Sequence, residues 1–256
     1  MHVRTRRVAF ATLAASSLLL MTACDSGSAS GSGSGSGPGS GSGAGGKKGK
    51  GTPSAPAYIT ANQAEQALVA LDDLPAGWKL EPNTGLDKSQ GASDDMVSGV
   101  KAECAPVTAV LNTGRLDEDH KANAQAVFVK KGDQTTIAQD VSGYPLTQAE
   151  KAMTGLRTAV GQCASVSATQ GGKKATLKVK KAAEQPQFGD ESIAYSVTVV
   201  QGGMQMDFDF ATVRSHGAVT TVLNNYSDHG DRGKEAFSKA LAEAAQKLVA
   251  AAAKTV

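Results

Sequence analysis

The sequence has few aromatic residues and few cysteines. Aromatic side chains make up 4% of its 256 residues, with a single tryptophan, and there are three cysteines. The formal net charge of +2 is unevenly distributed, because residues 1–57 carry a net +5 and leave −3 for residues 58–256. A weakly acidic segment poor in aromatics lacks the basic, stacking surface that nucleic acids require. We therefore expect no nucleic-acid partner.

Long apolar runs are also scarce, and the one that exists lies at the N-terminus. Residues 8–21 form an uncharged, largely apolar stretch behind Arg4, Arg6 and Arg7. Its length is typical of a signal-peptide core and falls short of the ~20 residues that a membrane-spanning helix needs. The arginine pair leaves both the general secretory and the twin-arginine export routes open.

A cysteine follows this apolar run directly. Met21, Thr22, Ala23 and Cys24 resemble a bacterial lipobox, although that motif prefers Leu at its first position. The resemblance implies cleavage before Cys24, a diacylglyceryl thioether on its thiol, and palmitate-like acyl chains that hold the protein on the outer face of the cell membrane. Two such chains anchor a protein stably, whereas one binds marginally. The alternative is an ordinary secretory signal that is cut after Ala23.

A Gly/Ser-rich segment separates this cysteine from the rest of the chain. Residues 25–57 consist of SG repeats followed by GAGGKKGKGTPSAPA, a composition that cannot form a packed core. We expect a flexible, disordered tether. The predicted organisation is a lipoprotein signal peptide over residues 1–23, the lipidated Cys24 and linker over residues 24–57, and one extracytoplasmic domain over residues 58–256.

The other two cysteines, Cys104 and Cys163, lie within that domain. Two cysteines in an exported domain most simply form one disulfide, and the alternative is a pair of free buried thiols. The histidines are scattered and share no ligand spacing with the cysteines. We therefore expect neither a metal nor another cofactor.

Three helices are indicated by caps and by apolar periodicity. Residues 60–63 form a capping box before AEQALVAL, and residues 147–150 form another before a pattern that runs to about Cys163. A long amphipathic helix is predicted over residues 233–253. Two short helices are expected within residues 94–112.

Alternating apolar residues predict an antiparallel sheet. Three β-rich runs between residues 191 and 226 are joined by Gly202-Gly203 and His216-Gly217, and short turns of this kind connect antiparallel strands. Further strand-like segments are residues 78–82, 122–131, 135–144 and 173–181. The sequence therefore predicts an α+β fold with an antiparallel sheet of about five or six strands and helices packed on one face.

Two strand-like segments carry charges that invite a functional interpretation. Asp207 and Asp209 alternate with Met and Phe residues, which predicts a solvated carboxylate face opposite a buried one. Two neighbours on one wet face do not offer the separated pKa values that acid–base catalysis needs. The lysines of residues 173–181 suggest an edge strand protected from aggregation, with an anionic-polymer site as the alternative.

No catalytic constellation is evident in the sequence. SDHGDRG at residues 227–233 places Asp228, His229 and Asp231 in one turn, whereas a Ser/His/Asp triad unites separate elements. A loop with a helix cap is the simpler interpretation. We therefore expect no enzyme and no catalytic residues. A cell-wall- or lipid-directed hydrolase is the alternative, and loss of turnover on mutating His229 would support it.

The overall pattern is similar to secreted lipoproteins of actinobacteria and, more distantly, to the extracellular sensor domain of certain actinobacterial serine/threonine kinases. The residues that carry the resemblance are Cys163, at the end of a helix, and the Gly189-Asp190 turn that opens the next strand. Those sensor domains usually hold two disulfides, whereas only Cys104 and Cys163 are available here. The resemblance implies a binding or sensing role, with a cleft beside the sheet.

The preferred hypothesis is a sensor-like module that binds a ligand or a partner at the cell envelope. Its cleft would lie between the Met/Phe strand face and the helices, lined by Trp78, Met206 and Phe208. The expected occupant is a small apolar ligand or an envelope protein. A core anchor is the plainer role for Trp78, and a structural envelope scaffold without a pocket is the plainer role for the whole domain.

Overall fold

The computed structural model describes residues 58–82, 97–116, 119–132, 135–226 and 233–255, which all belong to one compact unit spanning residues 51–256. Cys24, the predicted signal peptide and the predicted tether lie outside the described residues, as do residues 227–232 of the SDHGDRG turn. In the described part of the chain, no helix has the length and apolar character required to cross a membrane.

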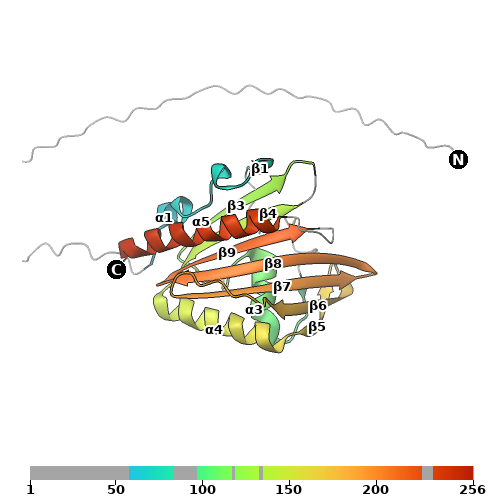
Figure 1. The fold of residues 1–256 in the computed structure, drawn as a ribbon. Helices are drawn as coiled ribbons and strands as arrows, with labels where there is room; N and C mark the ends of the chain where they lie inside the picture. Colours follow the sequence, from blue (N-terminus) through green and yellow to red (C-terminus); the bar gives the residue numbers. More distant parts are fainter. Residues whose placement is uncertain (1–57, 83–96, 117–118, 133–134, 227–232, 256) are drawn as a thin grey trace, which may run out of the picture. The chain divides into compact units, whose positions relative to one another are not determined.

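Nine strands form one sheet in the order β1-β3-β4-β9-β8-β7-β6-β5-β2 (Figure 1). All neighbouring strands pair antiparallel. The strands are β1 (Trp78–Leu80), β2 (Val97–Ser98), β3 (Ala122–Lys130), β4 (Thr136–Gly143), β5 (Ser165–Gln170), β6 (Lys173–Lys181), β7 (Glu191–Gln201), β8 (Met204–Ser215) and β9 (Ala218–Tyr226). The glycine turns at residues 202–203 and 216–217 join β7 to β8 and β8 to β9, as predicted.

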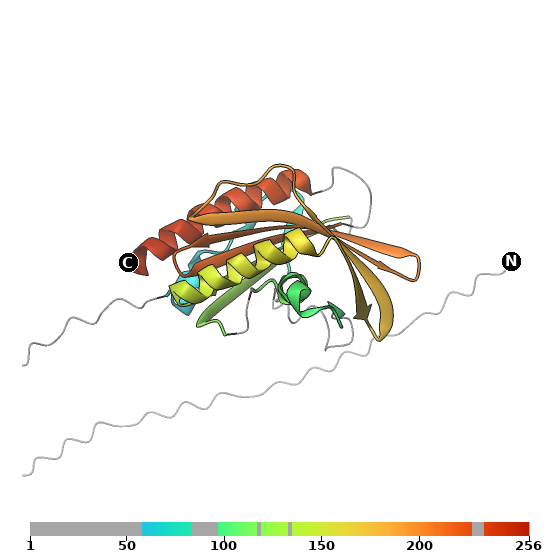
Figure 2. The same cartoon turned by 90° about the horizontal axis from the view of Figure 1, so that it is seen from below.

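Helices cover both faces of this sheet. On one face lie α1 (Ala61–Gln66) and α5 (Lys234–Ala252), and on the other lie α3 (Ala105–Thr113) and α4 (Leu146–Gln162). Figure 2 shows α5 in red and α4 in yellow on opposite sides of the strands. Short 3-10 turns complete the described elements: η1 (Leu71–Asp73), η2 (Ala102–Cys104) and η3 (Ala253–Thr255).

The α+β class and the antiparallel sheet are confirmed, while two details of the prediction are corrected. The sheet has nine strands rather than five or six, because β5 has a polar sequence and β2 lies in a segment expected to be helical. The helices pack on both faces, because β8 and β9 are buried at consecutive positions along residues 210–215 and 218–224. Buried threonines contribute to both faces, with Thr212 and Thr221 on the α4 side and Thr220 on the α5 side.

The lysine-rich strand is not an edge strand, so that expectation is wrong. β6 lies between β5 and β7 and is hydrogen-bonded to both. Its apolar residues Ala175, Leu177 and Val179 are buried toward α4, and the lysines that alternate with them are exposed. Lys174, Lys178 and Lys180 therefore lie on the sheet face that carries α5.

The two faces have separate hydrophobic cores. On the α5 side, Leu241, Leu248 and the alanines of α5 pack against Phe128, Ile137 and Val222 of the sheet. The small alanine side chains let the helix backbone approach the strands closely. On the α4 side, larger side chains fill the space between α3, α4 and the strands.

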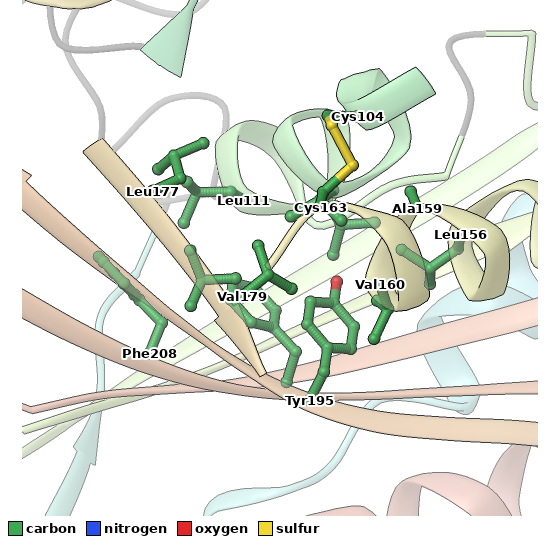
Figure 3. Packing of buried hydrophobic residues seen from close by; sticks show 14 of the residues in the cluster. Cys104, Leu111, Leu156, Ala159, Val160, Cys163, Leu177, Val179, Tyr195 and Phe208 are labelled. Atoms are coloured by element: carbon green, nitrogen blue, oxygen red, sulfur yellow. A yellow bond between two sulfur atoms is a disulfide. The ribbon is translucent and has the colours of Figure 1, made fainter. Parts of the chain in front are cut away.

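A disulfide closes the core on the α4 side. Cys104 and Cys163 are bonded, with an S–S distance of 2.05 Å and a Cα–Cα distance of 5.9 Å, which confirms the predicted bridge. Figure 3 shows the bridge next to Val160 of α4, with Tyr195 pointing from the sheet toward the same cluster. The bond joins the end of η2 to the end of α4 and so pins the two helical segments together.

The Gly189-Asp190 turn is shaped by the strand beside it. Gly189 has φ +59°, and a Cβ there would lie 2.3 Å from the carbonyl oxygen of Arg214. That carbonyl accepts a hydrogen bond from the Asp190 backbone N–H at 2.8 Å. The Asp190 carboxylate in turn accepts a hydrogen bond from the His216 backbone N–H at 2.6 Å and pairs with the Arg214 guanidinium at 3.3 Å. Only glycine fits this close approach.

Candidate functional site

A cavity of about 460 Å³ lies over strands β6, β7 and β8, on the face that carries α5. We call it the β6–β8 pocket and define it by its lining. The lining residues are Lys180, Lys181, Ala182, Ala183, Ala194, Tyr195, Ser196, Asp209, Phe210, Lys234 and Phe237. The strands form its floor, while the segment after β6 and the first turn of α5 form its walls.

The strand register assembles the polar floor of the β6–β8 pocket. Lys180 pairs with Ser196, Ser196 with Asp209, and Asp209 with Asn224, so one row crosses four strands. Opposite residues of an antiparallel pair point to the same face, which brings these side chains together. Within this row, Asp209 and Asn224 are the residues that lie nearest to the start of α5.

A second polar row runs beside the first. It contains Lys178, Thr198, Asp207 and Tyr226, again from β6, β7, β8 and β9. The Thr198 hydroxyl donates a hydrogen bond to Asp207 Oδ1 at 2.6 Å, and Gln205 Nε2 donates to Asp207 Oδ2 at 2.8 Å. The carboxylate of Asp207 is therefore engaged within the sheet surface.

Asp209 is the half-buried acid of the pocket. Burial raises the pKa of its carboxyl, and Asp207 acts in the same direction, against a hydrogen bond from the Tyr226 hydroxyl and the charge of Lys234. Burial and the two carboxylates raise the pKa of Tyr226 to about 12. The predicted solvated carboxylate face is thus wrong, since both aspartates are partly buried and hydrogen-bonded.

The segment after β6 is held firmly against the sheet. Gln185 Nε2 donates hydrogen bonds to the carbonyl oxygens of Ala182 and Ala194, at 2.8 and 2.9 Å. Its Oε1 accepts one from the Ala194 backbone N–H at 3.0 Å. A single glutamine side chain therefore ties this wall of the pocket to the edge of β7, which keeps the cavity preformed.

The opposite wall is the beginning of α5. Gly233 takes the N-cap position with φ +79°, and among the described residues no side chain forms a cap hydrogen bond there. A Cβ at Gly233 would lie 2.6 Å from Oδ1 of Asn224. Asn224 is completely buried and adjoins Asp209, whose charged form its side chain stabilises. The N-terminal end of a helix also carries partial positive charge.

A second polar cluster lies on the other face of the sheet, fully enclosed. Asp140 accepts hydrogen bonds from Asn123 Nδ2 and Gln125 Nε2, both at 2.7 Å, and from Ser142 Oγ at 2.6 Å. Burial raises the pKa of Asp140, while these three donors and Arg115 oppose the shift. Because Asp140 is 1% exposed, it has no access to a substrate, and we assign it a structural role.

The structure does not bring the predicted cleft residues together. Trp78 is buried in the core on the α5 side, whereas Phe208 is buried in the core on the α4 side. Met206 is 36% exposed and lies near the tip of the β7–β8 hairpin, with Met204 at 69%. Trp78 fills the role of core anchor.

The described residues assemble no evident reaction centre. No group of three or more His, Cys, Asp or Glu side chains in this part of the chain could hold a metal ion. The β6–β8 pocket contains neither histidine nor cysteine in its described lining. Its chemistry is that of ammonium groups, one carboxyl, a hydroxyl and an aromatic ring. The hydrolase hypothesis that centred on His229 falls outside the described residues and is untested.

Comparisons with known proteins support a likeness of fold. No family model matches the sequence, and no curated protein does. Among solved structures, the extracellular domain of PknH from Mycobacterium tuberculosis matches with a TM-score of 0.51 and 13% identity, over 73% of this chain and 97% of that one. An uncharacterised protein from Mycobacterium smegmatis, the Rv0999 ortholog, matches with a TM-score of 0.38 and 15% identity, over 79% of this chain and 98% of that one.

These findings define the class of fold. The chain is an α+β protein whose antiparallel sheet carries helices on both faces. Its fold is similar to that of the PknH extracellular domain, which confirms at the level of the fold the predicted resemblance to an actinobacterial extracellular domain.

Proposed function

We propose that this protein is a lipoprotein, anchored through Cys24 to the outer face of the cell membrane, whose domain is a sensor-like module that binds a small ligand. The observation that carries the binding role is the β6–β8 pocket. Its polar groups come from β6, β7, β8 and α5, and Gln185 holds its wall in place. Preformed cavities of this size with a few convergent polar groups are typical of ligand sites.

The extracytoplasmic location rests on two further observations. A disulfide such as Cys104–Cys163 persists in oxidising compartments and is rare in the cytosol. The fold is similar to that of an extracellular domain. Both fit a chain that is exported behind a signal peptide and then retained by acyl chains on Cys24.

The anchor is tested by growing cells with an alkyne-bearing fatty acid and then analysing the protein for the label. We expect the wild-type chain to be labelled and to sediment with membranes. Cys24→Ser should carry no label and should leave the membrane fraction. Cys104→Ser, which removes a different thiol, should keep the label. Labelling of Cys24→Ser would show that the lipid lies elsewhere, and membrane retention without label would contradict a lipid anchor.

Ligand binding is tested by native mass spectrometry of the mature chain purified from membranes in a non-ionic detergent. We expect a retained small mass that is lost on denaturation. Ser196→Trp fills the pocket floor and should abolish retention. Thr176→Trp, on the same sheet face but outside the pocket lining, is the matched control and should retain the mass. Equal retention by both variants would place the ligand elsewhere, and absence of any bound mass would contradict the ligand-binding role.

A further inference from the structure

We propose that the β6–β8 pocket binds the oxyanion group, phosphate or carboxylate, of a small organic molecule. This inference rests on the proposed function of the pocket as a ligand site and specifies the class of ligand. Lys180 from β6 and Lys234 from α5 are its charge partners, and the Ser196 hydroxyl lies between β6 and β8 in the same row.

The balance of charge in the lining favours an anion. Two lysines, Lys180 and Lys234, present their ammonium groups on the α5 side of the sheet, together with one acid, Asp209. Lys180 belongs to the floor and Lys234 to the α5 wall, so an anion held between them would interact with both ammonium groups. The partial positive charge at the start of α5 acts in the same direction. Charge-assisted hydrogen bonds from ammonium groups to phosphate or carboxylate are stronger than those between neutral groups.

Asp209 makes anion binding dependent on pH. The groups that face it are Asp207 of its own strand, Tyr226 of β9, Lys234 of α5 and the neighbouring Ser196 of β7. Burial favours the protonated carboxyl, and a bound anion nearby would favour it further. Binding should therefore be accompanied by proton uptake at Asp209, and affinity should increase as the pH falls.

The apolar part of the lining suits the body of an organic anion. Phe237 is half-buried on the α5 wall, and Ala182 and Ala183 form part of the opposite wall. An aromatic or aliphatic group between these walls would remove apolar surface from water at about 25 cal/mol per Å². Inorganic phosphate alone would lack this contribution and should bind more weakly than an aryl phosphate or an aryl carboxylate.

The test is isothermal titration calorimetry with the mature lipidated protein in a non-ionic detergent. The probes are phenyl phosphate, benzoate, inorganic phosphate, benzylamine and benzyl alcohol. We expect phenyl phosphate or benzoate to bind best, and the better of the two identifies the oxyanion. Lys180→Gln and Lys234→Gln should each weaken binding about 10-fold. Lys178→Gln, from the same face of β6 but outside the lining, should leave affinity unchanged.

The variant Asp209→Asn distinguishes an anionic ligand from a cationic or neutral one. It should strengthen binding of the anionic probe at pH 7.5 and reduce the dependence of affinity on pH. Stronger binding of benzylamine, or weaker anion binding by Asp209→Asn, would overturn the oxyanion assignment. A cationic or neutral molecule retained in native mass spectrometry would do the same while the ligand-binding role stands. If no probe binds and no mass is retained, the ligand-binding role fails as well.

Discussion

Removal of the Cys104–Cys163 disulfide should lower the free energy of unfolding by about 4 kcal/mol. The bond joins residues separated by 59 positions in the sequence. Without it the unfolded chain gains the freedom of a loop of that length, and the chain-entropy relation gives this magnitude at 25 °C. We expect the native contacts to change little, because both cysteines lie in a large buried cluster with many other apolar side chains.

The measurement is equilibrium unfolding in urea, in a Cys24→Ser background so that the bridge holds the only thiols. Trp78 is the single tryptophan, is 5% exposed and reports unfolding by fluorescence. With a urea dependence of about 2–3 kcal/mol per M, the midpoint should fall by about 1.3–2 M. Cys104→Ser, Cys163→Ser and the double variant should be destabilised equally, because each breaks the same bond.

Two results would refute this reasoning. A midpoint shift below roughly 0.5 M for the double variant would show that the unfolded chain was already restricted without the bond. A large difference between Cys104→Ser and Cys163→Ser would show that local packing, rather than the shared bond, determines the loss.

Three further predictions concern stability. Gly189→Ala should destabilise the domain by well over the ~1–2 kcal/mol of left-handed strain, because a carbonyl oxygen lies 2.3 Å from the new Cβ. Gly172 has φ +70° and open space around it, so Gly172→Ala should lose only the stability that corresponds to backbone strain, as measured by urea unfolding. Equal losses of stability in Gly189→Ala and Gly172→Ala would contradict a steric clash at Gly189. Burial raises the pKa of Asp140, so the folded state binds its proton more tightly and stability falls as the pH rises from about 4 toward the raised value. Asp140→Asn should flatten that fall in urea midpoints measured from pH 4 to 7, and an unchanged slope would reject this cause. Leu248→Ala should cost about 2–5 kcal/mol, whereas Val249→Ala, at an exposed site one residue along α5, should cost under about 0.5 kcal/mol. Similar losses in thermal unfolding would mean that the core contact of α5 is misplaced.

Features that depend on local sequence were predictable. The glycine turns at residues 202–203 and 216–217 fix two hairpins, and the capping box at Thr60 and Gln63 forms as expected. The long helix at the C-terminal end and the pairing of the two domain cysteines also follow from patterns within the sequence. The turns, the capping box and the helix depend on residues close together in the sequence, and the disulfide was predictable because the domain has only two cysteines.

Features that depend on the assembled sheet were not predictable. Thr212 and Thr221 are polar residues, which the sequence alone would place in solvent. In the structure both are buried on the α4 side of the sheet, with their Oγ1 atoms 3.1 Å apart. The alternation of residues 204–210 predicted that Met204 would be buried. It is exposed because the β7–β8 hairpin projects beyond the helices (Figure 2).

The candidate pocket was missed for the same reason. Lys180 and Asp209 are far apart in the sequence and become neighbours only through the registers of β6–β7 and β7–β8. The sequence contained part of the evidence for the pocket, since one predicted strand carries lysines and another carries aspartates. Without the register, each pattern indicated an ordinary solvated face, and nothing placed the start of α5 above them.

The strand order has a consequence for how the domain reaches its folded state. Strands β5 to β9 are neighbours in the sheet in the same order as in the sequence, but β4 pairs with β9. One edge of β4 (residues 136–143) can therefore form its hydrogen bonds only when residues 218–226 are present. Helix α5, which follows β9, packs across this junction against both strands. A chain that emerges N-terminus first therefore exposes an unpaired β4 edge until residues 218–226 are available. Such long-range pairing is slow and leaves the edge open to aggregation, so the β4 edge is the vulnerable surface of every partly made chain.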